Sequence, residues 1–296
     1  MRWWAAVGKV RGVSLEKILC LVCSSTRTKQ IGTTSSTSVF ECRDCTLTFC
    51  WPLPEVESES AGAHSITTEE SFTSGILSID PRRQRVLDAV AGRRHERYRS
   101  VLETSDYTLL EVGCGAAGLE PGLRRLGVDY HGMDLDPRPI DAAQARGVAN
   151  LTVGNFMEVP VKRQYDVIFM TQVLEHITHP REMVERLYAS LVPGGILHLD
   201  VPNQGTLAGW PSRLLRGSGP RLGAIDHPHH SIAYTPRALE VLLRPLFDVR
   251  TFTANSDDPV WGQAGTPGPA ARAYFAAQRV FHGRSLAVAF GRSRTT

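Results

Sequence analysis

The pattern of apolar and polar positions from residue 108 onward alternates between two periods. Short apolar runs, typical of buried strands, occupy 108–113, 128–134, 150–153, 165–171, 195–201, 247–253 and 285–291. Between them, apolar residues recur at helical spacing near 117–126, 137–146, 180–191, 235–245 and 271–281. This alternation of strands and helices predicts an α/β fold with a mostly parallel sheet covered on both faces.

Three segments precede this alternating region. Residues 14–50 form a compact unit with strand-like segments at 40–42 and 47–49, and residues 51–80 are rich in Ser, Thr and Glu with little periodicity. From 81 to 103, apolar positions at helical spacing are interspersed with arginines; these positions are Val86, Leu87, Val90, Tyr98, Val101 and Leu102. We therefore expect a small unit at 14–50, a linker or lid at 51–80, and a main domain at 81–296 that begins with an amphipathic helix.

Composition narrows the class of protein. The 296 residues are 42% hydrophobic and 21% charged, which is enough to bury a full core. The formal net charge is +3 and Lys and Arg are spread along the chain, so we do not expect a nucleic-acid partner. The N-terminal apolar stretch is too short for a signal peptide and no run approaches a membrane span. We therefore expect a cytoplasmic protein without a membrane partner, of undetermined oligomeric state.

The most informative motif is a glycine-rich turn at the start of the main domain. The run Thr108-Leu-Leu-Glu-Val-Gly-Cys-Gly-Ala-Ala-Gly118 ends a strand and opens a helix, and the next strand ends in Asp134. Glycines let backbone approach a ligand, a helix start offers unpaired N–H groups, and an acid can accept hydrogen bonds from a ribose diol. The pattern predicts a nucleotide-type site, a signal that dinucleotide-dependent dehydrogenases share.

Four of the six cysteines form two Cys-x-x-Cys pairs. Cys20 and Cys23 are separated by residues 24–41 from Cys42 and Cys45. In a chain without a secretion signal, this spacing predicts tetrahedral ligation of one zinc ion, so that residues 14–50 form a zinc ribbon whose metal supplies much of its folding free energy. The alternative is two pairs of buried thiols.

Further motifs follow the next strands. They are Gly154-Asn-Phe156, Gln172-Val-Leu-Glu-His-Ile177 and Leu191-Val-Pro-Gly-Gly-Ile-Leu-His-Leu-Asp-Val-Pro-Asn203. With the glycine-rich turn, in this order and spacing, they resemble the class I S-adenosylmethionine-dependent methyltransferases over residues 81–291. The resemblance implies a Rossmann-like, doubly wound sheet of seven mostly parallel strands, with S-adenosylmethionine as cofactor.

The resemblance also implies cofactor-binding roles by position. Glu111 matches the acid that orients the glycine loop and reaches the amino group of the methionine moiety, and Asp134 matches the ribose-binding acid. Asn155 stands where the family usually has an aspartate that accepts from the adenine amino group, and Ala117 occupies the usual third glycine. The other matched positions are Gly113, Cys114 and Gly115 in the turn, Leu135 and Phe156 beside adenine, and Gln172 and Val173 beside the methionine moiety. For Leu135 and Phe156, ordinary core packing is an equal alternative.

Two groups of histidines are candidates for acting on the acceptor. Methyl transfer is an in-line displacement, so the protein aligns the nucleophile and removes a proton where the nucleophile is poorly ionised. Glu175 and His176 follow the cofactor strand, and in the sugar C-methyltransferases that this chain resembles the matching histidine is the proposed base; structural packing is the alternative. His229 and His230, in Asp226-His-Pro-His-His230, can supply a base, bind a second metal or begin the next helix.

These motifs favour a small-molecule methyltransferase with an N-terminal zinc ribbon, acting on O, N or C of a secondary-metabolite or sugar-type acceptor. The second candidate is an RNA base methyltransferase, some of which also carry a ribbon, but residues 9–45 have only a slight basic excess and the following segment is acidic. The third candidate is a non-catalytic zinc-bearing scaffold that kept the fold. Failure to bind S-adenosylmethionine in calorimetry would exclude both enzymes.

Overall fold

The structure, a computed structural model, describes residues 18–34, 37–53, 79–161, 163–204, 225, 230–253 and 286–293. The strands are β1 (Thr28–Thr33), β2 (Ser38–Cys42), β3 (Thr48–Trp51), β4 (Thr108–Val112), β5 (Asp129–Asp134), β6 (Leu151–Val153), β7 (Tyr165–Thr171), β8 (Leu191–Pro202), β9 (Ile232–Ala233), β10 (Phe247–Thr253) and β11 (Leu286–Ser293). The helices are α3 (Pro81–Leu102), α4 (Glu120–Arg125), α5 (Pro137–Ala145), α6 (Pro180–Ala189) and α8 (Pro236–Leu243), with the 3-10 turn η2 at Leu174–His176. None of the described helices combines the length and apolar character needed to cross a membrane.

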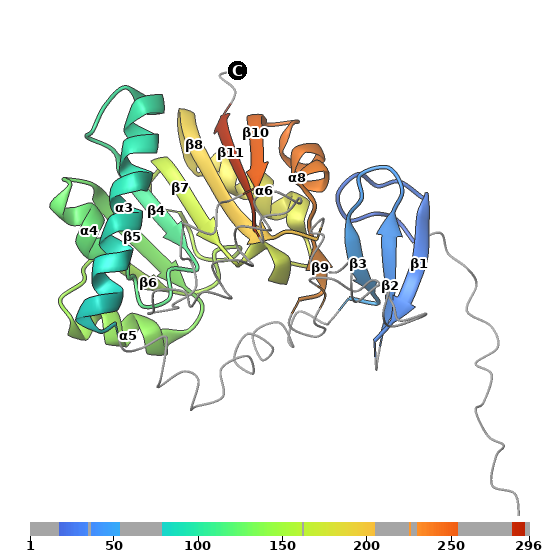
Figure 1. Ribbon diagram of the computed structural model, residues 1–296, viewed down its shortest axis with the longest axis horizontal. Helices are drawn as coiled ribbons and strands as arrows, with labels where there is room; N and C mark the ends of the chain where they lie inside the picture. The colour runs from blue at the N-terminus through green and yellow to red at the C-terminus, as the bar shows by residue number, and fades with distance from the viewer. Residues whose placement is uncertain are drawn as a thin grey trace, which may run out of the picture.

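The main sheet confirms the expected doubly wound α/β fold. Its seven strands run in the order β10-β11-β8-β7-β4-β5-β6, and β11 runs antiparallel to both of its neighbours while the other pairs are parallel. Leu109 and Phe169 pack in one core cluster with α3, which crosses the sheet in Figure 1, whereas Leu110 and Met170 pack with α6 and α8. Because both faces are covered, the central strands are mostly apolar, with Glu111, His198 and Asp200 as buried polar exceptions.

The observed bounds depart from the predicted ones where the backbone turns sharply. The helix expected at 117–126 begins only at Glu120, because Gly113, Gly115 and Ala117 have φ angles of 74°, 51° and 50° and prolong the turn. The strand expected at 195–201 already begins at Leu191. Residues 54–78 of the expected linker and the helix expected at 271–281 lie outside the described residues. The division of the chain at 14–50, 51–80 and 81–296 stays a prediction.

Sequence periodicity did not predict strands β1 and β9. The small sheet has the order β1-β2-β3-β9, and β9 comes from the main domain: Ile232 pairs with Phe49 and Ala233 with Thr48 in antiparallel register. A strand of two residues has no period to detect. Figure 1 shows the ribbon strands in blue beside β9 and α8, and Phe49 shares a hydrophobic cluster with Leu239 of α8. The ribbon and the main domain therefore share one core.

A buried polar network connects α3 to the centre of the main sheet. Arg94 forms an ion pair of 3.0 Å with Asp200, and its guanidinium lies 3.9 Å from the centre of the Phe169 ring. His198 Nε2 lies 3.1 Å from Asp200 Oδ1, and the Tyr98 hydroxyl lies 2.5 Å from His198 Nδ1. Burial lowers the pKa of His198. Burial opposes ionisation of Asp200 too, but His198 and Arg94 outweigh it and hold the pKa of Asp200 below its usual range.

We predict that Asp200→Asn lowers the free energy of unfolding by about 3–5 kcal/mol, because the Arg94 guanidinium is then buried without its counter-charge. Chemical denaturation measures this quantity. The control is Asp88→Asn, which breaks the more exposed ion pair with Arg125 and should change the free energy by less than about 1 kcal/mol. Similar losses in the two variants would contradict a stabilising role of the buried Arg94–Asp200 pair.

The pH dependence of stability gives a second check. Because the folded pKa of Asp200 is depressed, its stabilisation is present above about pH 4 and is lost as pH falls below that value; the Asp200→Asn variant should lack this decline.

Candidate active site

The glycine-rich turn after β4 forms an open cradle at the carboxyl end of the sheet. The N–H groups of Gly113 and Cys114 donate to the carbonyl of Met133 on β5, at 2.8 and 3.1 Å. A Cβ on Gly113 would lie 2.2 Å from Val173 Cγ2, so that position requires glycine, whereas a Cβ on Gly115 would meet nothing within 4 Å. A ligand can therefore approach the backbone over Gly115.

Asp134 closes the other side of the cradle at the end of β5. Its Oδ2 accepts from the N–H of Gly115 at 2.6 Å, and its Oδ1 accepts from the N–H of Asp136 at 3.0 Å. Burial raises the pKa of this carboxyl, and the two N–H groups oppose the rise. The next residue, Leu135, is 38% exposed. A hydrogen-bond acceptor and an accessible apolar side chain thus lie together, the combination that binds a nucleoside.

Glu111 is buried beneath the turn and accepts a hydrogen bond of 2.7 Å from the Tyr130 hydroxyl. Burial raises the pKa of Glu111 to about 7, although Tyr130 opposes the rise. A cationic group of a ligand would favour the ionised carboxylate. Cys114 beside it is also buried, and burial raises the pKa of its thiol well above the ordinary value, so it acts as a packing residue rather than a nucleophile.

The two residues expected beside adenine already have protein partners. Asn155 Oδ1 accepts from the N–H of Met157 at 3.0 Å, and its Nδ2 donates to Glu158 at 3.0 Å. Phe156 is buried in the core, with the Arg186 guanidinium 5.3 Å from its ring centre. A carbonyl oxygen has a second lone pair, so Asn155 can still accept another hydrogen bond. The roles of both residues toward the cofactor stay predictions.

Ala117 and Gln172 adopt left-handed backbone conformations near the turn. Their φ angles are 50° and 54°, and Ala117 precedes α4, so its departure from the glycine pattern is not relieved by a helical conformation. The side-chain amide nitrogen of Gln172 is buried and has no hydrogen-bond partner among the described residues. Backbone strain together with an unpartnered donor is typical of a residue that meets a ligand.

Beyond β7, the structure brings together an acid and two histidines. Glu175 and His176 lie on η2, and His230 lies two residues before β9; their candidate ligand atoms all lie within 4.8 Å of one another. The two imidazole ring centres are 4.9 Å apart, with their planes at 64°. His229 lies outside the described residues, so its predicted role is untested. We refer to Glu175, His176 and His230 as the acid–histidine cluster.

Glu175 is the most unusual member of this cluster. Its side chain is 1% exposed, yet neither carboxyl oxygen has a hydrogen-bond partner among the described residues. Burial raises its pKa to about 8. The Tyr234 hydroxyl nearby donates instead to the carbonyl of Leu174 at 3.4 Å. An unpartnered buried carboxyl calls for a ligand group that supplies the missing hydrogen bonds.

The four ribbon cysteines converge on one point. Cys20 Sγ lies 3.4 Å from Cys45 Sγ, Cys23 Sγ lies 3.6 Å from Cys42 Sγ, and all four sulfurs lie within 4.8 Å of one another as free thiols. A tetrahedral zinc ion with bonds of about 2.3 Å requires four sulfurs at similar separations. The donor set therefore fits the metal that the spacing predicted.

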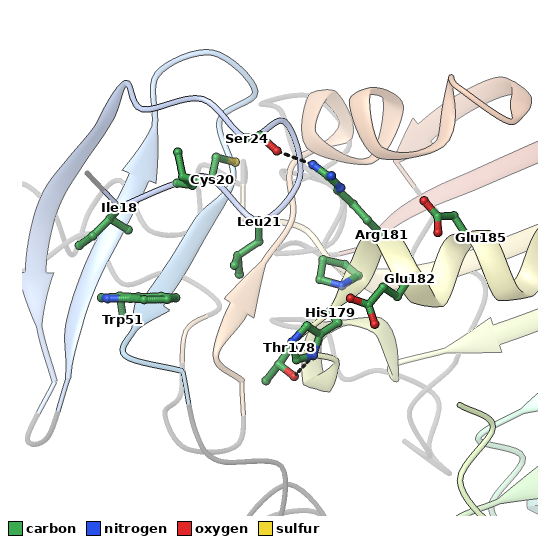
Figure 2. A pocket seen from close by; sticks show the side chains of 12 residues that line it. Ile18, Cys20, Leu21, Ser24, Trp51, Thr178, His179, Arg181, Glu182 and Glu185 are labelled. Carbon is green, nitrogen blue, oxygen red and sulfur yellow. Dashed lines mark hydrogen bonds between the residues drawn. The ribbon is translucent and has the colours of Figure 1, made fainter. Parts of the chain in front are cut away.

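A cavity of about 630 Å³ lies between the ribbon and the first turn of α6, as Figure 2 shows. Its ribbon wall includes the apolar side chains of Ile18 and Trp51, and its opposite wall includes His179 and Glu182. His179 lies three residues after His176, so the cavity begins close to the turn that carries the acid–histidine cluster.

Sequence reasoning missed three polar side chains that the structure places at or near these sites. Tyr130 reaches Glu111, while the hydroxyls of Ser24 and Thr46 each contact the main domain. Tyr130 shares a strand face with Asp134, which alternation could have shown. The signal for Ser24 and Thr46 is that a hydroxyl residue directly follows each Cys-x-x-Cys pair.

Comparisons with known proteins identify the family to which the chain belongs. A family model described as "Methyltransferase domain" matches residues 78–245. The ubiquinone biosynthesis O-methyltransferase of Bordetella avium is 26% identical over 157 residues, and that of Shewanella halifaxensis is 22% identical over 134 residues. These matches cover 51% and 43% of this chain but only 61% and 52% of the two relatives.

Among solved structures, the plantazolicin methyltransferase BpumL, in complex with a triazolic desmethylPZN analog and SAH, is similar in fold. Its TM-score is 0.50 at 17% identity, over 81% of this chain and 98% of BpumL. At that identity the likeness concerns the fold alone. The family model, in contrast, matches more than half of the 296 residues and includes the cradle and the η2 turn. The chain belongs to the methyltransferase domain family.

Proposed function

We propose that this protein transfers the methyl group of S-adenosylmethionine to a small-molecule acceptor. The observation that carries the proposal is the placement of two features at the carboxyl ends of adjacent parallel strands: the open cradle between β4 and β5, and the acid–histidine cluster after β7. Open α/β sheets bind their ligands at these ends. The family and the O-methyltransferases among the relatives support methyl transfer to such an acceptor.

The side chains of the cradle fit the parts of S-adenosylmethionine. In this proposal Asp134, which already accepts from the N–H of Gly115, also accepts from the ribose hydroxyls, and the exposed Leu135 borders adenine. Glu111, a buried carboxyl with a raised pKa, suits the cationic amino group of the methionine moiety, and the amide nitrogen of Gln172, which has no partner in the part of the chain that the structure describes, suits its carboxylate. When bound, the cofactor supplies a methyl group already activated as a sulfonium.

We assign His176 the role of general base for the acceptor. An imidazole titrates near neutral pH, so it can remove the proton of a hydroxyl that is poorly ionised as a nucleophile. The carboxyl of Glu175, which has no hydrogen-bond partner among the described residues, can accept a hydrogen bond from the acceptor or donate one to it, and His230 lies against the His176 ring. The acceptor class we propose is an O, N or C nucleophile of a secondary-metabolite or sugar-type molecule.

We also propose that Cys20, Cys23, Cys42 and Cys45 hold one structural zinc ion. The support is the convergence of four sulfurs, three of which are fully buried. A four-sulfur site has no open position for a substrate, so the metal stabilises the ribbon rather than taking part in methyl transfer.

For the cofactor, we predict that Asp134→Asn weakens S-adenosylmethionine binding by about 1–3 kcal/mol, because an acceptor for buried hydrogen bonds is lost. Isothermal calorimetry measures the dissociation constant. Asp129→Asn, at the exposed start of the same strand, is the matched control and should leave it unchanged. Equal affinities in the two variants would reject the cradle as the cofactor site.

For the base, we predict that His176→Ala lowers turnover by two orders of magnitude or more, roughly the contribution of a general base, while cofactor affinity stays nearly unchanged. Turnover is measured with labelled S-adenosylmethionine on an acceptor that the wild-type protein methylates in a screen of small hydroxyl and amine compounds. The control is His179→Ala, an exposed histidine three residues further on. Undiminished turnover of the first variant would assign the base elsewhere.

For the metal, Cys20→Ser should reduce the zinc content and destabilise the ribbon without abolishing cofactor binding. Metal analysis of the purified protein provides the readout. Cys50→Ser is the control, since this buried thiol belongs to the ribbon but not to the four-sulfur cluster. A full zinc content in Cys20→Ser would refute the ligand assignment.

A further inference from the structure

The two Cys-x-x-Cys turns of the ribbon, at 20–24 and 42–46, repeat the same backbone geometry, and we refer to them as the knuckles. The N–H of Ser24 donates to the carbonyl of Cys20 at 2.9 Å, and the N–H of Thr46 donates to that of Cys42 at 3.0 Å. Ser24 and Thr46 each directly follow the second cysteine of their pair, and their φ angles are 57° and 66°. This left-handed conformation favours glycine, and it is especially unfavourable for a β-branched residue such as threonine.

Each of these strained residues uses its hydroxyl to contact the main domain. Arg181 donates a hydrogen bond to the Ser24 hydroxyl, as Figure 2 shows, and the Thr46 hydroxyl lies 2.6 Å from that of Thr235. Thr46 donates to the carbonyl of Cys45, and Thr235 accepts from the N–H of Ala238; the proton between the two hydroxyls therefore comes from Thr235. Strain that persists in two equivalent places calls for a function of the side chains.

The two contacts fall at corresponding places relative to the acid–histidine cluster. Arg181 is in the first turn of α6, five residues after His176, and Thr235 is the N-cap of α8, five residues after His230. One knuckle thus holds the segment that carries His176, and the other holds the segment that carries His230.

Between the two contacts, the ribbon also pairs with the backbone that follows His230. The N–H of Cys50 donates to the carbonyl of Ser231 at 2.8 Å, and β3 and β9 pair at Phe49–Ile232 and Thr48–Ala233. Ser231, Ile232 and Ala233 are all at most 4% exposed. The backbone that directly follows His230 is therefore held by the ribbon as well as by the main domain.

We propose that the ribbon is a clamp for the acceptor site: Ser24 and Thr46 are positioning residues that hold the segments of His176 and His230 together and so set the geometry of the imidazole pair. The proposal rests on the proposed function in one respect, the role of His176 as base. Although Gln172 and Val173 precede η2, the main part of the cradle lies on β4 and β5, beyond β7 in the sheet order, so release of the clamp should disturb the imidazole pair and spare cofactor binding.

The test is the double variant Ser24→Gly with Thr46→Gly in the full-length, metal-loaded protein. Glycine tolerates both φ angles, so the ribbon folds while both hydroxyl contacts are lost. Glu103→Gly is the matched control, because Glu103 has a φ of 59° at the end of α3, on the main domain. A second control, Thr46→Ser in the otherwise wild-type chain, keeps the hydroxyl that contacts Thr235. Zinc content establishes that each ribbon is intact.

The readouts are the imidazole NMR signals of His176 and His230, assigned by single substitutions, and the affinity for S-adenosylmethionine by calorimetry. We expect both imidazole signals to move in the double variant and to stay in place in Glu103→Gly and Thr46→Ser, with cofactor affinity equal in all. Unmoved signals in a zinc-loaded double variant would overturn the clamp. If the wild-type protein does not bind S-adenosylmethionine, the proposed function fails, but the NMR comparison still decides the clamp.

Once the screen has identified an acceptor that the wild-type protein methylates, turnover of that acceptor gives a second readout. A displacement of about 1 Å between reacting groups can lower the rate on the order of 10²-fold, so kcat should fall in the double variant more than in Glu103→Gly. A purely structural role predicts instead a lowered Tm with unchanged kcat at temperatures where the protein is folded, and that result would also overturn the proposal.

Discussion

The pairing of β9 with β3 is the interaction on which the rest of this structure depends. Buried backbone N–H and C=O groups need partners, and the segment 230–235 finds them on two sides, at β3 of the ribbon and, through Tyr234, at Asn203 and Gln204 after β8. A strand of two residues would not persist alone. Because it is held between the two sheets, the ribbon completes the main domain, and its apolar residues share one hydrophobic cluster with α6 and α8.

Burial opposes ionisation of every buried carboxyl group, yet the pKa values of Asp200 and Glu175 shift in opposite directions. Asp200 lies between Arg94 and His198, and their opposing charge and hydrogen bond keep it ionised inside the core. Glu175 is just as buried but has no partner among the described residues, and its pKa rises to about 8. A satisfied buried network makes a scaffold rigid, whereas an unsatisfied group marks a place for a ligand. The paired Asp200 therefore belongs to the scaffold that joins α3 to the main sheet, whereas Glu175 belongs to the candidate site at η2.

The polarity of parallel strands explains why the candidate site is assembled at one edge. The glycine turn, Asp134 and η2 all follow carboxyl ends of adjacent strands, so residues far apart in the chain meet there without any long-range motif. The ribbon borders the same edge through β9 and the cavity beside α6. In the function that we propose, the cofactor half of this arrangement depends on β4 and β5, and the acceptor half depends on contacts between the ribbon and the main domain.

The sequence by itself determined the features that arise from local chemistry. Apolar periodicity predicted the strands and helices of the main domain, the glycine turn and Asp134 predicted the cradle, and the cysteine spacing predicted a cluster of four sulfurs. These follow from residues that lie in short, continuous stretches of the chain, where period, φ preference and ligand spacing act directly. The exact start of α4 was not predictable, because the turn extends through Ala117 in a conformation that its side chain disfavours.

Only the tertiary structure decided how the histidines are arranged and which polar groups have partners. His176 and His230 meet because β9, too short to show a period, pairs with the ribbon, and Tyr130 reaches Glu111 because the register of β4 and β5 places them on one face. Whether a buried carboxyl such as Glu175 is paired depends on every segment that packs around it. The physical reason is that hydrogen bonding and desolvation are set by neighbours in space, and the sequence lists only neighbours in the chain.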